Sequence, residues 1–282
     1  MRDRRRAPAQ LSDIVLIPNL LSIAGSDPSG GAGIQADLKT FAALGCHGMA
    51  ALTALTAQNT MGVSAVHMPP AAFVGEQIAM IFADIEVAAI KIGMLGSPEI
   101  VEAVAAALAG RRGIPIVLDP VLVATSGAVL GSDGVIAAMR RHLFPLATVI
   151  TPNLAEAARL GDRPVSSGRP DMEAAAARLH AGGTAAWLIK GGHGGDDRSD
   201  DVLFDGAAST WFSAPRIDTR NTHGTGCTLS SAIAAFLAKD VPLVDAVRMA
   251  KAYLTAALTG ADALHVGKGS GPVDHFVGWR KV

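Results

Sequence analysis

The chain has 282 residues, of which 50% are hydrophobic and 17% are charged, and its net charge is -1. This balance excludes a disordered chain and a protein that coats nucleic acid. The mean hydropathy is +0.34, but much of the apolar count is alanine and no stretch of ~18 apolar residues lacks a break, so no membrane-spanning helix is expected. The length fits one α/β domain with a large core.

The N-terminal segment differs from the rest of the chain. It contains a basic run from Arg2 to Arg6 that includes Asp3 and is too short for a nucleic-acid arm or a transit peptide. We therefore predict a flexible basic segment over residues 1–18 and a single domain over residues 19–282. The two cysteines cannot form a disulfide framework and no secretory segment follows the arginines, so we expect a reducing compartment, the cytoplasm.

Runs of branched apolar residues alternate with alanine-rich stretches of helical spacing, which predicts the βαβα order of an α/β fold with a mostly parallel sheet. The predicted strands are residues 19–24, 50–56, 87–92, 115–119, 148–151 and 185–190, followed by a hairpin over residues 202–212. The clearest helix begins at Pro98, after the candidate cap Ser97, and ends before Gly110. Two long helices are expected to begin near Thr225 and Leu243.

Ligands of open parallel sheets bind beyond the carboxyl ends of the strands, so the loops that leave strands are candidate sites. Four such loops are predicted at residues 25–33, 58–62, 119–131 and 191–197, and a fifth segment, residues 221–227, opens a helix. The first loop is rich in glycine, but no third glycine follows Gly31 and Gly33 at the spacing of a dinucleotide site, and no Gly-Lys-Ser/Thr closes it. A dinucleotide-dependent oxidoreductase is therefore weakly supported.

The helix after this loop carries a carboxylate beside its apolar side. Ile34, Leu38 and Phe41 form one apolar stripe, and Asp37 lies on its margin. A carboxylate in this position needs a partner. A backbone N–H and a bound ligand are equally good candidates.

The segment Asn221-Thr-His-Gly-Thr-Gly-Cys227 places Gly224 and Gly226 where a helix begins. Unpaired N–H groups at such a helix start suit an anion that develops charge during a reaction. Cys227 then lies in the first turn, where we expect the pKa of its thiol to fall toward neutrality. The alternative is a small residue that packs at a helix start, which is also how we interpret Cys46. For Cys227 the glycines favour a functional role.

Two further patterns follow predicted strands. Asn153 and Glu156 have the spacing of a capping box, which the sequence does not distinguish from a carboxylate placed to hold Mg²⁺. Asp119 ends one predicted strand and Lys190 ends another, immediately before Gly191. A charge at the carboxyl edge of a sheet is more often a site residue than one in the middle of a strand, although a solvated loop charge is the alternative.

Six segments of the chain, in this order, closely resemble the bifunctional hydroxymethylpyrimidine and phosphomethylpyrimidine kinases of thiamine biosynthesis, in the ribokinase-like superfamily. These segments are residues 24–40, 53–60, 91–95, 151–156, 190–193 and 221–230. The resemblance spans the chain from about Asn19 to Gly271. It implies a three-layer α/β/α sandwich with a mostly parallel central sheet, usually assembled as a homodimer.

The resemblance also implies an activity. Such a kinase uses ATP and Mg²⁺ to phosphorylate 4-amino-5-hydroxymethyl-2-methylpyrimidine, and then converts the monophosphate to the diphosphate. The site residues that it implies are Gln58, Asp37, Ala32, Met94 and Val121 for the pyrimidine, Asn153 and Lys190 for the nucleotide, Glu156 and Asp119 for Mg²⁺ and the phosphates, and Gly224, Thr225, Gly226 and Cys227 for catalysis.

Two further expectations come from the same resemblance. Residues 120–131 resemble a flap that excludes water. Sugar kinases of this fold have Asp where this chain has Cys227, whereas the pyrimidine kinases have Cys. A thiolate in this position would take the hydroxyl proton late in the first transfer. The phosphate acceptor of the second transfer needs little or no base, so we expect Cys227 to matter less there.

Pyridoxal kinase activity is the nearest alternative, because both acceptors are flat heteroaromatic alcohols. The adjacent Gln58 and Asn59 favour the aminopyrimidine, because a carboxamide both donates and accepts hydrogen bonds. A remoter alternative is a pyrimidine-binding sensor without catalysis, which the joint presence of Glu156, Lys190 and Cys227 disfavours.

Overall fold

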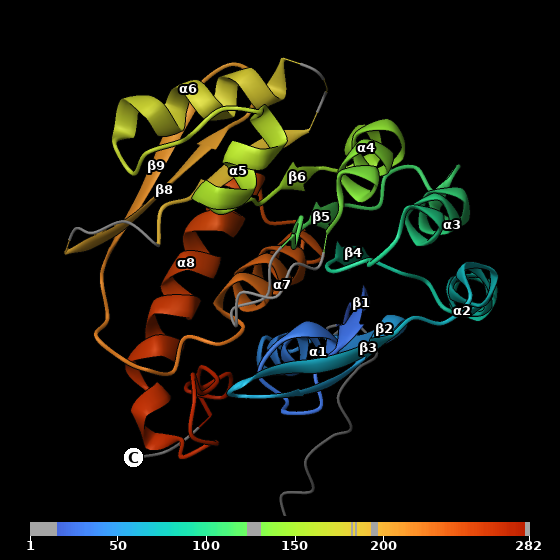
Figure 1. Cartoon of the computed structure of the whole chain (residues 1–282), viewed down its shortest axis with the longest axis horizontal. Helices are drawn as coiled ribbons and strands as arrows, with labels where there is room; N and C mark the ends of the chain where they lie inside the picture. Colours follow the sequence, from blue (N-terminus) through green and yellow to red (C-terminus); the bar gives the residue numbers. More distant parts are fainter. Residues whose placement is uncertain (1–15, 123–130, 182, 184, 193–196, 280–282) are drawn as a thin grey trace, which may run out of the picture.

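The computed structural model describes residues 16–122, 131–181, 183, 185–192 and 197–279. In this part of the chain, nine strands form one sheet in the order β3-β2-β1-β4-β5-β6-β7-β8-β9 (Figure 1). The strands are β1 (Asn19–Ser26), β2 (His47–Asn59), β3 (Gly62–His67), β4 (Ala89–Ile92), β5 (Ile116–Leu118), β6 (Val149–Ile150), β7 (Ala186–Lys190), β8 (Arg198–Phe204) and β9 (Ser209–Pro215). Neighbouring strands from β2 to β7 are parallel, whereas β3 pairs with β2, and β8 with β7 and β9, in antiparallel fashion.

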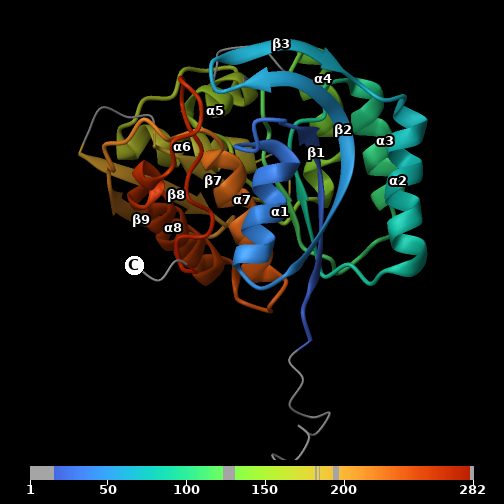
Figure 2. The same cartoon turned by 90° about the horizontal axis from the view of Figure 1, so that it is seen from below.

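Helices cover both faces of the sheet. One layer contains α1 (Gly33–Ala43), α7 (Thr225–Leu237) and α8 (Leu243–Thr259). The other contains α2 (Ala71–Asp84), α3 (Pro98–Leu108), α4 (Asp133–His142), α5 (Leu154–Gly161) and α6 (Arg169–His180). Figure 2 shows α1 and α7 side by side on their face of the sheet. The fold is therefore the expected three-layer α/β/α sandwich.

Side chains of the strands alternate between two hydrophobic cores, as the pleat of a strand requires. In β1, Leu20 packs in the core with α1, α7 and α8, whereas Leu21 and Ile23 pack in the core with α2 to α6. In β5, Val117 joins the first core and Leu118 the second. This alternation decides which polar residues at the strand ends face α7.

The predicted strands and helix starts are confirmed in outline. The helix α3 begins at Pro98, and Ser97 Oγ caps it by accepting a hydrogen bond from Ile100 N at 3.3 Å. The helices α7 and α8 begin at Thr225 and Leu243, as predicted. Ser97 marks the first of these three helix starts in the sequence, Gly224 the second and Pro242 the third.

The strand β3 was not predicted, and the segment 58–62 is not a loop that leaves a strand. β2 continues to Asn59 and turns directly into β3, so Gln58 is a strand residue. β3 lies at the sheet edge and most of its side chains are exposed, so the sequence lacks the buried apolar alternation that marks a strand.

Some predictions fall outside the described residues. Most of the expected flap, residues 123–130, and most of the expected flexible segment, residues 1–15, lie outside the description. In the part that is described, none of the helices has the length and hydrophobicity needed to cross a bilayer.

Candidate active site

Five neighbouring strands carry a polar row at their carboxyl ends, on the face covered by α1 and α7. The row consists of Ser22 in β1, Lys91 in β4, Asp119 after β5, Thr151 after β6 and Lys190 in β7. Each row residue follows by two positions a residue of the α7-facing core, namely Leu20, Ala89, Val117, Val149 and Leu188. The alternation of strand side chains therefore directs the whole row toward the same helices.

Asp119 and Lys190 form the centre of the row. Lys190 Nζ lies 2.8 Å from Asp119 Oδ1, which also accepts a hydrogen bond from Thr151 Oγ1 at 3.1 Å. Burial alone raises the pKa of Asp119, but the charges of Lys190 and Lys91 outweigh it and hold the pKa below its ordinary value. For Lys190, burial lowers the pKa, and the Asp119 charge more than compensates. Both groups are charged, and the structure brings these two predicted site residues together.

The start of α7 lies over this pair. Gly224 is the N-cap with φ +79, and a Cβ there would lie 1.8 Å from Gly31 O. A Cβ on Gly226 would lie 3.3 Å from Lys190 Nζ and 3.4 Å from Asp119 Oδ2. Glycine is needed at position 224 because of its positive φ and its approach to another loop, whereas at position 226 its absence of a side chain keeps the charged pair uncrowded.

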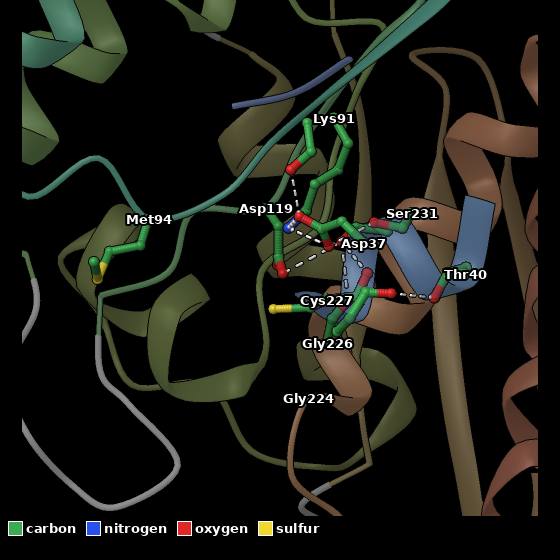
Figure 3. Close-up of polar contacts among 12 residues, drawn as sticks. Asp37, Thr40, Lys91, Met94, Asp119, Gly224, Gly226, Cys227 and Ser231 are labelled. Atoms are coloured by element: carbon green, nitrogen blue, oxygen red, sulfur yellow. Dashed lines mark hydrogen bonds and ion pairs between the residues drawn. The ribbon is translucent and has the colours of Figure 1, made fainter. Parts of the chain in front are cut away.

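Cys227 is half-buried in the first turn of α7. Burial foremost raises the pKa of its thiol to about 11; the Lys91 charge opposes this shift, and the charges of Asp37 and Asp119 contribute to it. The prediction of a pKa near neutrality is therefore wrong. That prediction took into account the electrostatic field of the helix N-terminus, but not the burial of the thiol or the charges of the two nearby carboxylates. Figure 3 shows the Cys227 side chain pointing away from the Asp37 carboxylate, on the side where Met94 lies.

Asp37, which is predicted to line the pyrimidine pocket, has its partners inside the protein. Its side chain is fully buried, and both carboxylate oxygens lie 2.9 Å from Lys91 Nζ. Ser22 Oγ and Ser231 Oγ donate to the same carboxylate at 2.6 and 2.7 Å. The partner of Asp37 is therefore an internal cation, a possibility that the sequence interpretation did not weigh.

A second network, which sequence reasoning missed, joins three segments around His223. His223 Nε2 lies 2.8 Å from Asp27 Oδ2 and 3.3 Å from Gln58 Nε2. The same Asp27 oxygen accepts hydrogen bonds from Gly31 N at 3.1 Å and Ala32 N at 2.9 Å. Burial raises the pKa of Asp27, but its bonds to His223 and Ser29 lower it to about 2, so the carboxylate is ionised.

This network places Gln58 and Ala32, two predicted ring-binding residues, next to the segment that precedes Cys227. The available sequence signal was the polar pair of Asp27 and His223 inside the two glycine-rich motifs. Nothing in the sequence indicated that residues 196 positions apart are bonded to each other.

Met94 and Val121 are the other two predicted ring-binding residues, and both are half-buried. The Met94 carbonyl accepts a hydrogen bond from Thr53 Oγ1 at 2.5 Å, and its side chain packs against Gly25, where a Cβ would lie 2.5 Å from Met94 Cε. Val121 N donates to Asp119 O at 2.8 Å, so Val121 directly follows the charged pair.

Asn153 and Glu156 form the predicted capping box at the start of α5. Glu156 N donates to Asn153 Oδ1, and Asn153 N donates to Glu156 Oε2, both at 2.9 Å. The pKa of Glu156 is raised to about 7, foremost by burial; the charge of Lys190 opposes this shift, and the charge of Asp119 contributes to it. Asn153 also pairs with Lys190 through a backbone bridge. Capping is therefore confirmed, and it leaves Glu156 within the field of the charged pair.

We expect Glu156→Gln to separate the two possible roles of this residue. The amide oxygen of Gln still accepts the bond from Asn153 N, so the melting temperature should stay nearly unchanged. A neutral amide holds Mg²⁺ or its water shell poorly, so the Mg²⁺ concentration for half-maximal activity should rise ~10–100-fold. Ser97→Ala is the control, because it removes the side-chain cap of α3 and should cost ~1 kcal/mol of stability without this shift. Normal activity of the Gln variant at every Mg²⁺ concentration would leave capping as its only role.

Comparisons with known proteins agree with this geometry. The profile of the phosphomethylpyrimidine kinase family matches residues 27–274. The hydroxymethylpyrimidine/phosphomethylpyrimidine kinase of Rhizobium meliloti (strain 1021) is 52% identical over 261 residues, which cover 93% of this chain and 98% of that protein. The thiamine biosynthesis bifunctional protein ThiED of Geobacter sulfurreducens is 49% identical and is covered over 55% of its length, by 99% of this chain.

Among solved structures, pyridoxal kinase from Staphylococcus aureus in complex with AMP-PCP and pyridoxal is similar to this chain with a TM-score of 0.86. The two chains are 35% identical, and the match covers 94% of this chain and 96% of the other. This similarity supports the ribokinase-like sandwich, and the family profile extends over almost the whole described domain. The chain belongs to the phosphomethylpyrimidine kinase family, whose members are phosphotransferases.

Proposed function

We propose that this chain transfers the γ-phosphoryl group of ATP to the hydroxymethyl group of 4-amino-5-hydroxymethyl-2-methylpyrimidine, and then a second one to the monophosphate, in thiamine biosynthesis. One observation carries the proposal. The glycine-bearing start of α7 lies directly over the pair of Asp119 and Lys190, with Cys227 in the same turn. Helix N–H groups and a lysine ammonium next to a potential base suit phosphoryl transfer.

The acceptor ring would lie between the first loop and β2. Gln58 supplies an amide that both donates and accepts hydrogen bonds, which suits the aminopyrimidine edge. Ala32, Met94 and Val121 supply apolar walls for a flat ring. Cys227 would then accept the proton of the hydroxymethyl group as the first transfer proceeds, whereas the phosphate acceptor of the second transfer needs little or no base.

The nucleotide would lie on the Lys190 side of the row. A cavity of about 850 Å³ runs between β9 and α8 and includes Lys251 in its lining. Lys251 Nζ pairs with Asp201 at 2.6 Å, and Asp201 accepts a hydrogen bond from Gly191 N at 3.0 Å. Because Gly191 adjoins Lys190, this cavity suits the base and ribose of ATP while Lys190 and Asn153 serve the phosphates.

Mg²⁺ fits the carboxylates next to this phosphate position. Asp119 and Glu156 are close enough for the charge of one to raise the pKa of the other, and such a pair favours a cation. Among the described residues, no group of three or more His, Cys, Asp or Glu forms a complete metal cage. That arrangement is typical of an ion held partly by substrate phosphates, and a bound Mg²⁺ would neutralise phosphate charge during transfer.

The proposal is tested by product analysis with Mg-ATP and three acceptors offered separately: the hydroxymethylpyrimidine, its monophosphate and pyridoxal. We expect the pyrimidine mono- and diphosphates as the efficient products. Pyridoxal phosphate as the only efficient product would overturn the proposal in favour of pyridoxal kinase, the activity named for the similar Staphylococcus aureus structure. Binding of the pyrimidine without any ATP turnover would identify a sensor.

Gln58→Leu is expected to weaken binding of the hydroxymethylpyrimidine. The substitution roughly keeps the volume but leaves the polar edge of the ring unpaired, which costs ~1–3 kcal/mol of binding free energy. Gln77→Leu is the matched control, because the Gln77 amide bonds only the backbone of Leu52, at 2.9 and 3.1 Å. Calorimetric titration measures both variants. An unchanged affinity of the Gln58 variant would show that another residue reads the ring.

We also propose a homodimer that works in the cytoplasm. The edge strand β3 leaves backbone groups unpaired on one side, and the exposed apolar residues Met61, Val66, Met68 and Phe73 lie on or near it. A second copy of the chain would cover such a surface. Both cysteines are free, as a reducing compartment favours. Light scattering of the wild type and of Val66→Glu tests the assembly, and an unchanged mass would exclude this interface.

A further inference from the structure

A fully buried ion pair lies beside the first turn of α7. Asp37 from α1 and Lys91 from β4 have no exposed side-chain surface, and the ammonium group lies 2.9 Å from both carboxylate oxygens. Ser22 and Ser231 complete the carboxylate with hydrogen bonds of 2.6 and 2.7 Å. The pair therefore joins β1, β4, α1 and α7 at one point.

Stability alone is a poor explanation for this pair. Taking two charges out of water costs several kcal/mol per ion, and apolar residues of similar volume are often equally stabilising. The hydrophobic core that contains Leu20, Phe41 and Ala89 adjoins the pair through the same strands and helix. The Asp37–Lys91 pair costs desolvation free energy, and apolar side chains could fill the same space. We therefore look for a role of the pair beyond stability.

The position of the pair suggests that role. Ser231 lies four residues after Cys227, so the two side chains share one face of α7 and are separated by one helical turn. Because Ser231 bonds the carboxylate that holds Lys91, the ammonium group is tied to α7 one turn beyond Cys227, and its charge lowers the pKa of the thiol (Figure 3). Burial lowers the pKa of Lys91, but Asp37 foremost, and then Cys227 and Asp119, raise it above its ordinary value. The ammonium group is therefore charged.

The charges along the polar row alternate in sign. The row itself contains Lys91, Asp119 and Lys190 in this order, and Asp37 of α1 adds a negative charge next to Lys91. Lys190 is partly accessible and suits the nucleotide, whereas Lys91 is sealed from solvent beneath α7. Lys91 is thus the buried cation on the acceptor side of the row.

We propose that Asp37 and Lys91 are positioning residues for the first phosphoryl transfer: Asp37 fixes the Lys91 ammonium group beneath the start of α7, where its charge stabilises the Cys227 thiolate that receives the hydroxyl proton. This inference rests on the proposed function, in which Cys227 is the base. The pair touches neither substrate directly. Its effect is exerted through Cys227 and through the placement of the α7 start.

The test is the double variant Asp37→Leu with Lys91→Met, which replaces both charges by apolar groups. The melting temperature should fall only moderately, because no buried charge is left unpaired, although the hydroxyls of Ser22 and Ser231 lose their acceptor. The kcat of the first phosphorylation should fall ~10²-fold with little change in KM for ATP, and the second phosphorylation should lose clearly less. Thr40→Val is the matched control on α1, because the Thr40 hydroxyl donates to Ala36 O within the same helix.

A second readout needs no turnover. Alkylation of Cys227 by iodoacetamide at pH 8, quantified at the peptide level to separate it from Cys46, should be slower in the double variant, because Lys91 lowers the pKa of the thiol more than Asp37 raises it and the thiolate is the reacting form. This readout survives even if the pyrimidine kinase assay fails for the wild type, so failure of the inference and failure of the proposed function are distinguishable.

Equal losses in both phosphorylations with an unchanged alkylation rate would overturn the inference and leave the pair a packing element. So would unchanged kinetics in the double variant. If that variant does not fold, Ser231→Ala removes only the bond between α7 and the carboxylate. It should then slow the first phosphorylation and the alkylation while the second phosphorylation is preserved. Unchanged rates in this variant would equally reject the proposal.

Discussion

Cys227→Ser is expected to slow the first phosphorylation by ~10²–10⁴-fold, because the hydroxyl that replaces the thiol is a far weaker acid and cannot supply an anionic base. The second phosphorylation should lose much less, because its acceptor is already an ionised phosphate. Cys46→Ser is the matched control, since Cys46 is buried away from the row and bonds only Leu44 O. Separate assays with the hydroxymethylpyrimidine and its monophosphate measure the two steps.

The pH profile gives this prediction a second check. Burial raises the pKa of Cys227 to about 11, and a base is active in its deprotonated form. The kcat/KM for ATP in the first phosphorylation should therefore keep rising with pH through pH 8 and 9 in the wild type, and it should be flatter in the Ser variant. Equal losses in both steps, with parallel pH profiles, would instead indicate damage to the α7 start.

Gly224→Ala is expected to abolish most activity in both steps and to destabilise the protein. A side chain at φ +79 costs ~1–2 kcal/mol, and the added Cβ would lie 1.8 Å from Gly31 O, which is backbone and cannot rotate away. Overpacking of this kind adds ~1–3 kcal/mol. Because the helix start would shift from its place over Lys190, the loss of kcat should be similar for both acceptors. Denaturant titration and steady-state kinetics measure the two effects.

Gly110→Ala provides the control for this second prediction. Gly110 has φ +80, but its Cβ would meet nothing within 4 Å. It should show the conformational cost alone, with full activity. Equal free energies of unfolding for the two variants would show that the close approach of Gly224 to Gly31 adds no cost. That result would contradict the explanation of why glycine starts α7.

The sequence predicts the layout of this molecule better than its electrostatics. Alternating apolar strands, the Ser97 cap and the glycines before Thr225 are local signals, and they locate the sheet and the start of α7. The placement of Asp119 and Lys190 at strand ends also follows from local pattern, since parallel strands end at one edge.

The internal charges could not be predicted in the same way. The partner of Asp37 comes from β4, and its other ligands come from β1 and α7. The pKa of Cys227 depends on a balance between burial, one ammonium group and two carboxylates. The partners of Asp37 and the pKa of Cys227 depend on distances between segments that are far apart in the sequence. The spacing of residues along the chain therefore does not predict them.

The bond between Asp27 and His223 spans 196 positions of the chain, and with the approach of Gly224 to Gly31 it closes the site from opposite ends of the sequence. Contacts of such long range form only after a large loop has been closed, which makes them slow and late in folding. A partly synthesised chain that lacks α7 has the charged strand ends but no helix start above them. The α7 start and the Gln58 amide, which we propose bind the phosphates and the ring, are therefore brought into place in the same late event, and a growing polypeptide is not expected to consume ATP before its acceptor pocket exists.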